Sequence, residues 1–180
     1  MNVSRRVILY SVTAAWVLGV CSFAGQAAAW YDLSGPWQSR AVHRLVGQRR
    51  ADFIEPNDLV IHQFNLGMSG PEDPTTPLSG HRRLMSGCRF HSCYEKAAVV
   101  LTAANNAEAV GIVHFHCRYA PRPKHSKLSR RRYVDCDSSS RLTMYIAAGR
   151  DAQDDSSALI RWARTVSRPD IPSETILIHR

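Results

Sequence analysis

The second half of the chain contains runs of apolar residues whose length and spacing predict β-strands. Residues 96–103 (KAAVVLTA) and 109–117 (AVGIVHFHC) are separated by the turn residues Asn105 and Asn106, so we expect these two strands to form a hairpin. Because residues 109–117 are apolar at consecutive positions, this strand is expected inside the sheet, with both of its faces covered. Further strands are predicted at residues 83–88, 141–148 and 174–179.

Between residues 155 and 166 the apolar positions change to a helical period. The apolar stripe consists of Leu159, Trp162, Ala163 and Val166, at i, i+3, i+4 and i+7. We expect this helix to pack on the sheet, and Asp154 or Asp155 is positioned to cap its start.

The first part of the domain gives weaker patterns. A short helix is predicted after Ser39, where helical spacing is shown by Val42, Leu45 and Val46. Residues 65–80 are rich in Gly, Pro, Ser and Asp, which predicts a loop. The elements together predict an α+β domain, in which an antiparallel sheet of about five strands carries a helix on one face.

The first 29 residues have the organisation of a secretory signal peptide. Arg5 and Arg6 form a positive segment, residues 7–20 (VILYSVTAAWVLGV) are mostly apolar, and the small residues 27–29 precede Trp30. A membrane anchor is the alternative, but an apolar segment of this length falls short of the roughly 20 residues that a bilayer requires. We therefore expect export and cleavage before Trp30, with no membrane span in the mature chain.

Residues 30–180 are then predicted to form one domain, since this length suffices for a single core. Loss of Cys21 with the signal leaves four of the five cysteines: Cys88, Cys93, Cys117 and Cys136. Four cysteines in an exported protein favour disulfides, with three possible pairings. Cleavage also removes two of the 23 basic residues and none of the 15 acidic ones, which leaves a formal charge of +6. This charge favours contact with anionic surfaces.

The stretch GCRFHSC, residues 87–93, places His91 between two closely spaced cysteines. A zinc site is one interpretation, but structural zinc sites mostly use C-x-x-C turns. A thioredoxin-like motif does not fit, because four residues rather than two separate Cys88 from Cys93. In an oxidising compartment the pair is expected to close on itself, so a disulfide accounts best for this spacing.

A disulfide of this kind has two interpretations. So short a ring adds little global stability by chain entropy, but it restricts the backbone at its tip, so a side chain there loses less entropy on binding. The loop consists of Cys88, Arg89, Phe90, His91, Ser92 and Cys93. The alternative is a disulfide that only staples the end of a hairpin, with His91 as a solvated bystander.

The segment 80–116 resembles the inhibitor of vertebrate lysozyme family, the Ivy-type periplasmic proteins of Gram-negative bacteria. The matching features are a strand that leads to CRFHSC, a C-x-x-H-x-C loop like the CKPHDC loop of the family, and the hairpin AVVLTAANNAEAVGIV with a glycine early in its second strand. Phe90 stands where the family usually has proline, and Ser92 where it usually has aspartate.

The resemblance implies a periplasmic inhibitor of c-type lysozyme rather than an enzyme. Lysozyme cleaves glycan with two carboxyl groups about 5 Å apart. By resemblance, the loop 88–93 would enter the lysozyme cleft and His91 would hydrogen-bond both carboxyl groups, with no cofactor. Family members include dimers, so a homodimer is a further expectation.

The charge of the chain bears on this expectation. Common animal lysozymes are strongly basic, so an inhibitor with a charge of +6 would need locally acidic patches to dock quickly. The candidates are Glu72, Asp73, Glu95, Glu108, Asp135, Asp137 and the acidic residues of 151–155.

A basic segment, residues 118–132, gives a second candidate function. Its cations are Arg118, Arg122, Lys124, Lys127, Arg130, Arg131 and Arg132. Such a run can bind the phosphates of lipopolysaccharide or an anionic glycan of the envelope, or it can be a solvated loop between strands. Export argues against nucleic acid as the partner.

Two further chemistries are weighed against binding. His114 and His116 are two apart on a predicted strand and would point to one face, where they could hold copper or zinc together with His91 or His125. A structural histidine pair is the favoured alternative, so no metal site is predicted. Cys117 would point the other way and pair with Cys136. Enzyme motifs are absent from the sequence, and no free thiol remains if both disulfides form, so we expect a binding protein.

Overall fold

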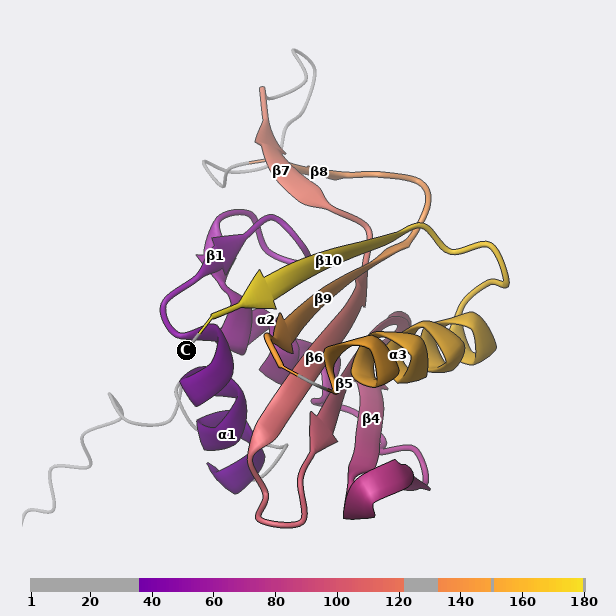
Figure 1. The fold of residues 1–180 in the computed structure, drawn as a ribbon. Helices are drawn as coiled ribbons and strands as arrows, with labels where there is room; N and C mark the ends of the chain where they lie inside the picture. The colour runs from indigo at the N-terminus through magenta and orange to yellow at the C-terminus, as the bar shows by residue number, and fades with distance from the viewer. Residues whose placement is uncertain (1–35, 122–132, 150, 180) are drawn as a thin grey trace, which may run out of the picture.

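The computed structural model describes residues 36–121, 133–149 and 151–179, and Figure 1 shows a six-stranded sheet at its centre. The signal-like segment 1–29 lies outside the described residues. The strands run in the order β10-β9-β6-β5-β4-β3. Their bounds are β3 Thr76–Pro77, β4 Arg83–Arg89, β5 Ser92–Leu101, β6 Ala107–His114, β9 Arg141–Ala147 and β10 Ser173–Ile178.

The predicted hairpin of two apolar strands forms the middle of this sheet. β5 and β6 pair antiparallel, with Ala98 opposite Gly111, and β6 is also paired with β9. The side chains of β6 are buried along almost its whole length, as its apolar pattern predicts for a strand with two covered faces. The strand ends at His114 rather than at Cys117.

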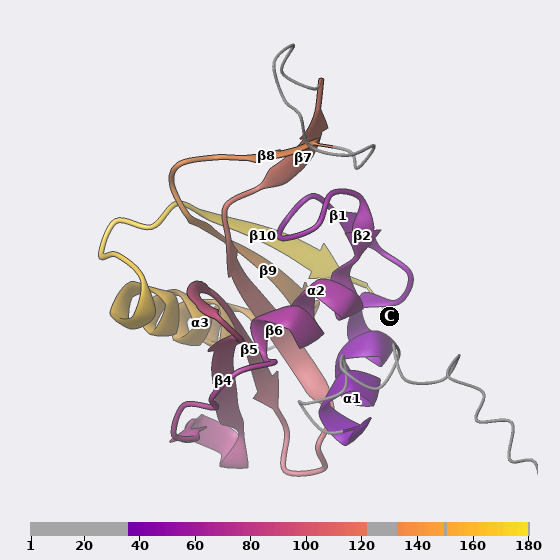
Figure 2. The same ribbon diagram turned by 180° about the vertical axis from the view of Figure 1, so that it is seen from behind.

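Helices cover both faces of the sheet. α3 (Ala152–Val166) packs Leu159 and Trp162 on one face, against Ala98, Val100 and their neighbours. On the opposite face lie α1 (Pro36–Val46) and α2 (Val60–Gly67), which Figure 2 shows from behind. There Val42 and Phe64 meet the other side of the same strands. Each buried strand therefore contributes alternate residues to two cores.

The α+β prediction is confirmed, and several details differ from it. The sheet has six strands, and β10 runs parallel to β9, because α3 crosses over the sheet between them. The opposite face carries two helices, one of which, α2, falls partly within the predicted loop 65–80. α1 begins at Pro36, before the predicted start at Ser39.

The start of α3 also differs from the prediction. Asp151 is the N-cap residue, and it makes no side-chain capping bond. Asp155 is instead buried, and its carboxylate lies 2.6 Å from Nη1 of Arg82, which precedes β4. Burial raises the pKa of Asp155 to about 6, against the opposing attraction of Arg82. The ion pair ties α3 to the sheet.

Two small antiparallel pairs stand outside the main sheet. β1 (Arg50–Ala51) pairs with β2 (Asp58–Leu59), and β7 (Cys117–Ala120) pairs with β8 (Tyr133–Cys136). A short 3-10 helix, η3 (Ser79–His81), precedes β4. Within the described ranges, no helix has the length and apolar character needed to cross a membrane.

Candidate protein-binding loop

The turn between β4 and β5 is the loop that the sequence analysis singled out, and we call residues 88–93 the tip loop. β4 ends at Arg89 and β5 begins at Ser92, so only Phe90 and His91 form the turn itself. The predicted disulfide between Cys88 and Cys93 is confirmed. His91 has a φ of 63°, and this left-handed conformation is the one that closes so short a turn.

A neighbouring segment braces the base of the tip loop. The backbone N–H of Gly70 donates to the carbonyl of Cys88 at 2.7 Å, and the N–H of Cys88 donates to the carbonyl of Pro71 at 3.3 Å. A Cβ atom on Gly70 would lie only 2.7 Å from the same Cys88 oxygen, so the close approach requires glycine. The predicted loop 65–80 therefore acts as a support for the tip loop.

Side chains complete this support. The hydroxyl of Ser69 accepts a hydrogen bond from the backbone N–H of Phe90 at 3.0 Å. The guanidinium of Arg89 donates to the carboxylate of Glu95 at 2.7 Å, and the Glu95 side chain is buried. The turn is thus fixed by the disulfide, by backbone hydrogen bonds and by an ion pair.

The tip loop exposes aromatic surface beside the histidine. Phe90 is 59% exposed and His91 is exposed, and their ring centroids lie 4.0 Å apart. Tyr94, directly after Cys93, is 79% exposed. The sequence analysis did not single out Tyr94, although an aromatic residue next to the loop cysteine was a usable signal. Exposed aromatic side chains are common anchors in protein interfaces.

A second disulfide lies at the same end of the sheet. Cys117 and Cys136 are joined, as predicted, and they close the base of strands β7 and β8, which we call the arm. Lys96 of β5 pairs with Cys88 on one side and with Val113 on the other, so the tip loop and the arm both extend from this end. Figure 1 shows the arm projecting beyond the main sheet.

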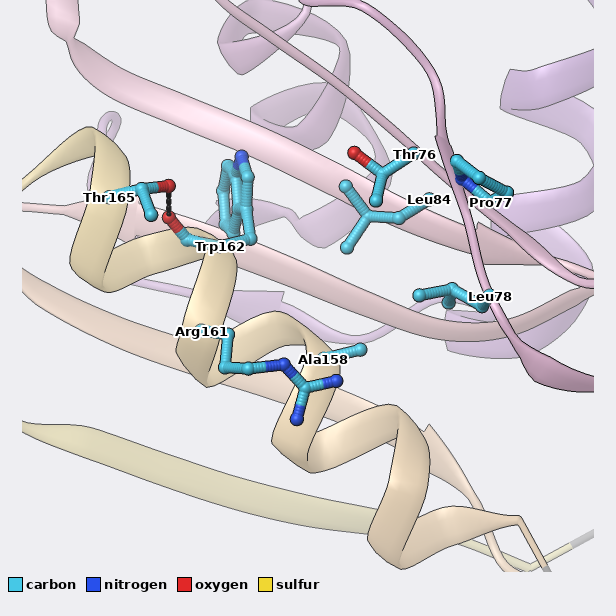
Figure 3. A pocket seen from close by; sticks show the side chains of 8 residues that line it. All are labelled: Thr76, Pro77, Leu78, Leu84, Ala158, Arg161, Trp162 and Thr165. Carbon is cyan, nitrogen blue, oxygen red and sulfur yellow. Dashed lines mark hydrogen bonds between the residues drawn. The ribbon is translucent and has the colours of Figure 1, made fainter.

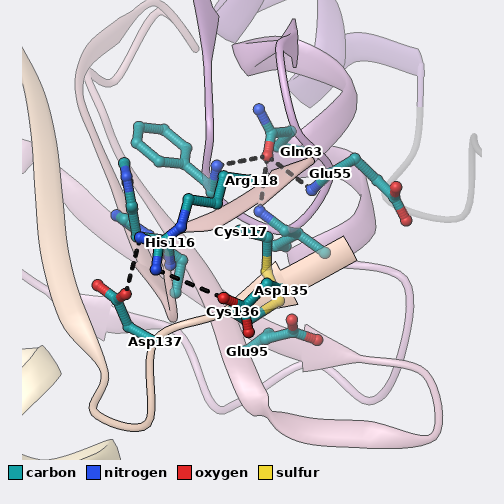
Figure 4. Close-up of a disulfide and its surroundings, with 12 residues drawn as sticks. Glu55, Gln63, Glu95, His116, Cys117, Arg118, Asp135, Cys136 and Asp137 are labelled. Atoms are coloured by element: carbon teal, nitrogen blue, oxygen red, sulfur yellow. Dashed lines mark hydrogen bonds and ion pairs between the residues drawn. A yellow bond between two sulfur atoms is a disulfide. The ribbon is translucent and has the colours of Figure 1, made fainter. Parts of the chain in front are cut away.

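Most of the predicted anion-binding segment falls outside the described residues. The cations that lie outside the described residues are Arg122, Lys124, Lys127, Arg130, Arg131 and Arg132. Arg118 is described, and its guanidinium lies 3.4 Å from the carboxylate of Asp135 and 3.5 Å from that of Asp137, as Figure 4 shows. The positive charge of Arg118 is therefore compensated by its own neighbours.

Gln63, a residue that the sequence analysis missed, organises the support of the arm. Its buried side-chain oxygen accepts backbone N–H bonds from Phe53, Ile54 and Glu55, the last two at 2.7 and 3.2 Å. The same loop offers the carbonyls of residues 52 and 53 to the N–H of Cys117. The available sequence signal was a glutamine between apolar residues of α2, because a polar side chain that becomes buried there needs hydrogen-bond partners.

His114 has a structural role, and His116 lies beyond the end of β6 rather than on it. β6 ends at His114, and the backbone N–H of His116 donates to Nδ1 of His114 at 3.0 Å, so Nε2 carries the proton and lies 3.0 Å from Thr143 Oγ1. The His114 ring is buried against Phe53, and burial lowers its pKa to about 3. Both ring nitrogens are engaged, so this ring has none free for a metal. Among the described residues, no group of three or more His, Cys, Asp or Glu side chains could hold a metal ion.

The acidic candidates do not gather into one uncompensated patch beside the tip loop. Glu95 is paired with Arg89, and Asp137 with Arg118 and Arg141. Asp155 and Glu108 lie around Arg82 at the opposite end of the sheet. Glu72 and Asp73, which lie beside β4, are exceptions. Glu72 forms a bridge with Gly87, Asp73 accepts a hydrogen bond from the hydroxyl of Ser86, and neither makes an ion pair with a described residue.

Comparison with known proteins gives no relative for this chain. No protein-family model, no curated protein and no solved structure matches it.

Proposed function

We propose that the protein is a periplasmic inhibitor of c-type lysozyme that inserts its tip loop into the substrate cleft of the enzyme. One observation carries the proposal: His91 is exposed at the end of a two-residue turn that is closed by a disulfide and braced by residues 69–71. A turn that is already ordered loses little conformational entropy when it enters a cleft, so more of its contact energy is available for binding.

The chemistry of the tip loop fits a pair of carboxyl groups. Two carboxyl groups about 5 Å apart leave room for one imidazole between them, whose two nitrogens can each donate a hydrogen bond when the ring is protonated. Nearby carboxylates favour the protonated imidazole, and the resulting charge-assisted hydrogen bonds are stronger than neutral ones. The tip loop then blocks catalysis by occupying the substrate cleft, without a chemical step of its own.

The aromatic residues beside His91 give the remaining contact area. The ring of Phe90 lies tilted against the imidazole of His91, and Tyr94 extends from the first residues of β5. Aromatic rings suit the walls of a sugar-binding cleft because they bury a large apolar area with few rotatable bonds. Uncharged contacts of this kind are not weakened by the basic charge of common lysozymes.

The test is a titration of the purified, oxidised protein against c-type lysozyme hydrolysing bacterial cell walls. We expect stoichiometric inhibition by the wild type and a roughly hundredfold weaker inhibition by His91→Ala, because two charge-assisted hydrogen bonds are lost. His81→Ala is the matched control, since His81 is also an exposed histidine with a positive φ, of 58°. It should inhibit like the wild type.

A second variant separates the side chain from the backbone. Asparagine accepts the left-handed conformation readily, so His91→Asn keeps the turn but cannot become a cation. We expect its inhibition to be weakened almost as much as that of His91→Ala. Full inhibition by both variants, or no inhibition by an excess of wild type, would contradict the proposal.

A further inference from the structure

A cavity of about 410 Å³ lies between α3 and the edge of the sheet, and it shares no residue with the tip loop. One wall is α3, with Ala158, Trp162 and Thr165, and the other is the segment from β3 to β4, with Leu78 and Leu84, as Figure 3 shows. The cavity forms where α3, which packs mainly over β6 and β9, meets β4 and the segment 76–78 at the edge of the sheet.

The cavity is mainly apolar. Leu84 and Trp162 are almost fully buried members of the core on this face, and Leu78 packs against the same core. In Figure 3 the indole of Trp162 stands on one side of the space and the side chain of Leu84 on the other. The volume lies within the roughly 300–1,000 Å³ typical of small-molecule sites.

One donor at this cavity has no acceptor. It is the guanidinium of Arg161, which is exposed at the cavity and makes no ion pair with a described residue. The indole N–H of Trp162 also has no hydrogen-bond partner among the described residues, but it is buried and a ligand in the cavity does not reach it.

The charge of the lining is one-sided. Among the described residues that line it, Arg161 is the only charged one, and none carries a carboxylate. An anionic head group inside this cavity therefore meets no lining carboxylate, whereas Asp154 and Arg82 line the adjoining pocket that shares Arg161. A guanidinium binds a carboxylate through two parallel N–H···O bonds, so one arginine matches one carboxylate.

We propose that this cavity binds an aliphatic monocarboxylate, with the alkyl chain between Trp162 and Leu84 and the carboxylate on Arg161. The apolar walls select the chain, and the single unpaired cation selects the charge. The site is independent of the tip loop, so it stands or falls separately from lysozyme inhibition.

The test is isothermal titration calorimetry of the purified, oxidised protein with octanoate, decanoate and octanol. Each added methylene should tighten binding about fourfold, so decanoate should bind more than tenfold tighter than octanoate. Octanol, which has the chain but no charge, should bind at least tenfold more weakly than octanoate.

Variants of α3 identify the charge that is responsible. Arg161→Gln should weaken decanoate binding about tenfold and leave octanol binding unchanged, because only the carboxylate uses the guanidinium. Arg164→Gln is the matched control, since Arg164 is an exposed arginine of the same helix that does not line the cavity. It should bind decanoate like the wild type.

The outcomes separate this proposal from the proposed function. His91→Ala should bind decanoate with the affinity of the wild type. Absence of decanoate binding, equal affinity for octanoate and octanol, or an unchanged affinity in Arg161→Gln would each overturn the carboxylate site, whatever the result with lysozyme.

Discussion

The tip loop and the arm leave the same end of the sheet, and each is closed by a disulfide that joins a buried cysteine to an exposed one. The two differ in the length of chain that they close, because the cysteines are 5 residues apart in the tip loop and 19 in the arm. They also differ in support. The tip loop is held along its length by residues 69–71, whereas the arm is held at its base, where Cys117 meets the loop organised by Gln63.

The comparison shows that one kind of covalent bond serves two purposes here. Chain entropy makes the longer loop the greater contributor to stability. The shorter loop contributes less to the stability of the fold, but it orders the few side chains that a partner would contact. Removal of each disulfide should therefore separate stability from binding.

The largest expected effect is on the pH dependence of stability, and it comes from His114 at the base of the arm. Folding lowers the pKa of His114 to about 3, so the unfolded chain binds this proton more strongly, and stability is lost as the pH falls from about 6.5 toward 3. At pH 4 the contribution of His114 should be a loss of roughly 3 kcal/mol relative to pH 7, while Asp155, whose raised pKa favours the folded state at low pH, acts in the opposite direction. His114→Gln should remove most of it in urea unfolding at the two pH values.

The control for this effect is His62→Gln, because His62 is exposed and its ring bonds to Asp58 on the surface. This variant should retain the acid sensitivity of the wild type. An equal loss of stability on acidification in wild type and His114→Gln would show that His114 is not kept neutral by the fold.

Removal of the disulfide of the arm should have the second-largest effect. Replacement of Cys117 and Cys136 by serine removes a 19-residue cross-link and should lower the free energy of unfolding by about 3 kcal/mol. Lysozyme inhibition per folded molecule should be unchanged, because the tip loop keeps its own disulfide and braces. A large loss of inhibition in the folded variant would mean that the arm contacts the partner.

Opening the tip loop should weaken inhibition, unlike opening the arm, and should cost less stability. Replacement of Cys88 and Cys93 by serine should cost about 2 kcal/mol of stability, since the closed loop is shorter. Inhibition should weaken about tenfold, because the turn would then be ordered only on binding. Unchanged inhibition would show that the braces alone order the turn.

The smallest effect should come from a single brace. Ser69→Ala removes the hydroxyl that accepts the Phe90 N–H and should cost about 1 kcal/mol, with a few-fold loss of inhibition. Ser167→Ala is the control, because it removes an exposed serine hydroxyl that bonds to Ser140 and belongs neither to the tip loop nor to its braces. Equal inhibition by both variants would contradict a bracing role for Ser69.

Local sequence features predicted much of the candidate site. Cys88 and Cys93 are so close in sequence that their disulfide, and the exposure of His91 between them, follow from this spacing and from the predicted export. The braces could not be predicted in this way. Ser69 and Gly70 lie in a polar loop, and nothing in the spacing of that loop indicates which strand it will follow.

By itself, the sequence determined the elements whose pattern is local. The apolar runs predicted the hairpin of β5 and β6, and the helical stripe predicted α3. In both cases the spacing of the residues that become buried is a property of the local sequence. Only the tertiary structure decided the parallel direction of β10, the pairing of Asp155 with Arg82 and the burial of His114. These features join residues distant in sequence, so their energies depend on which surfaces meet when the chain packs.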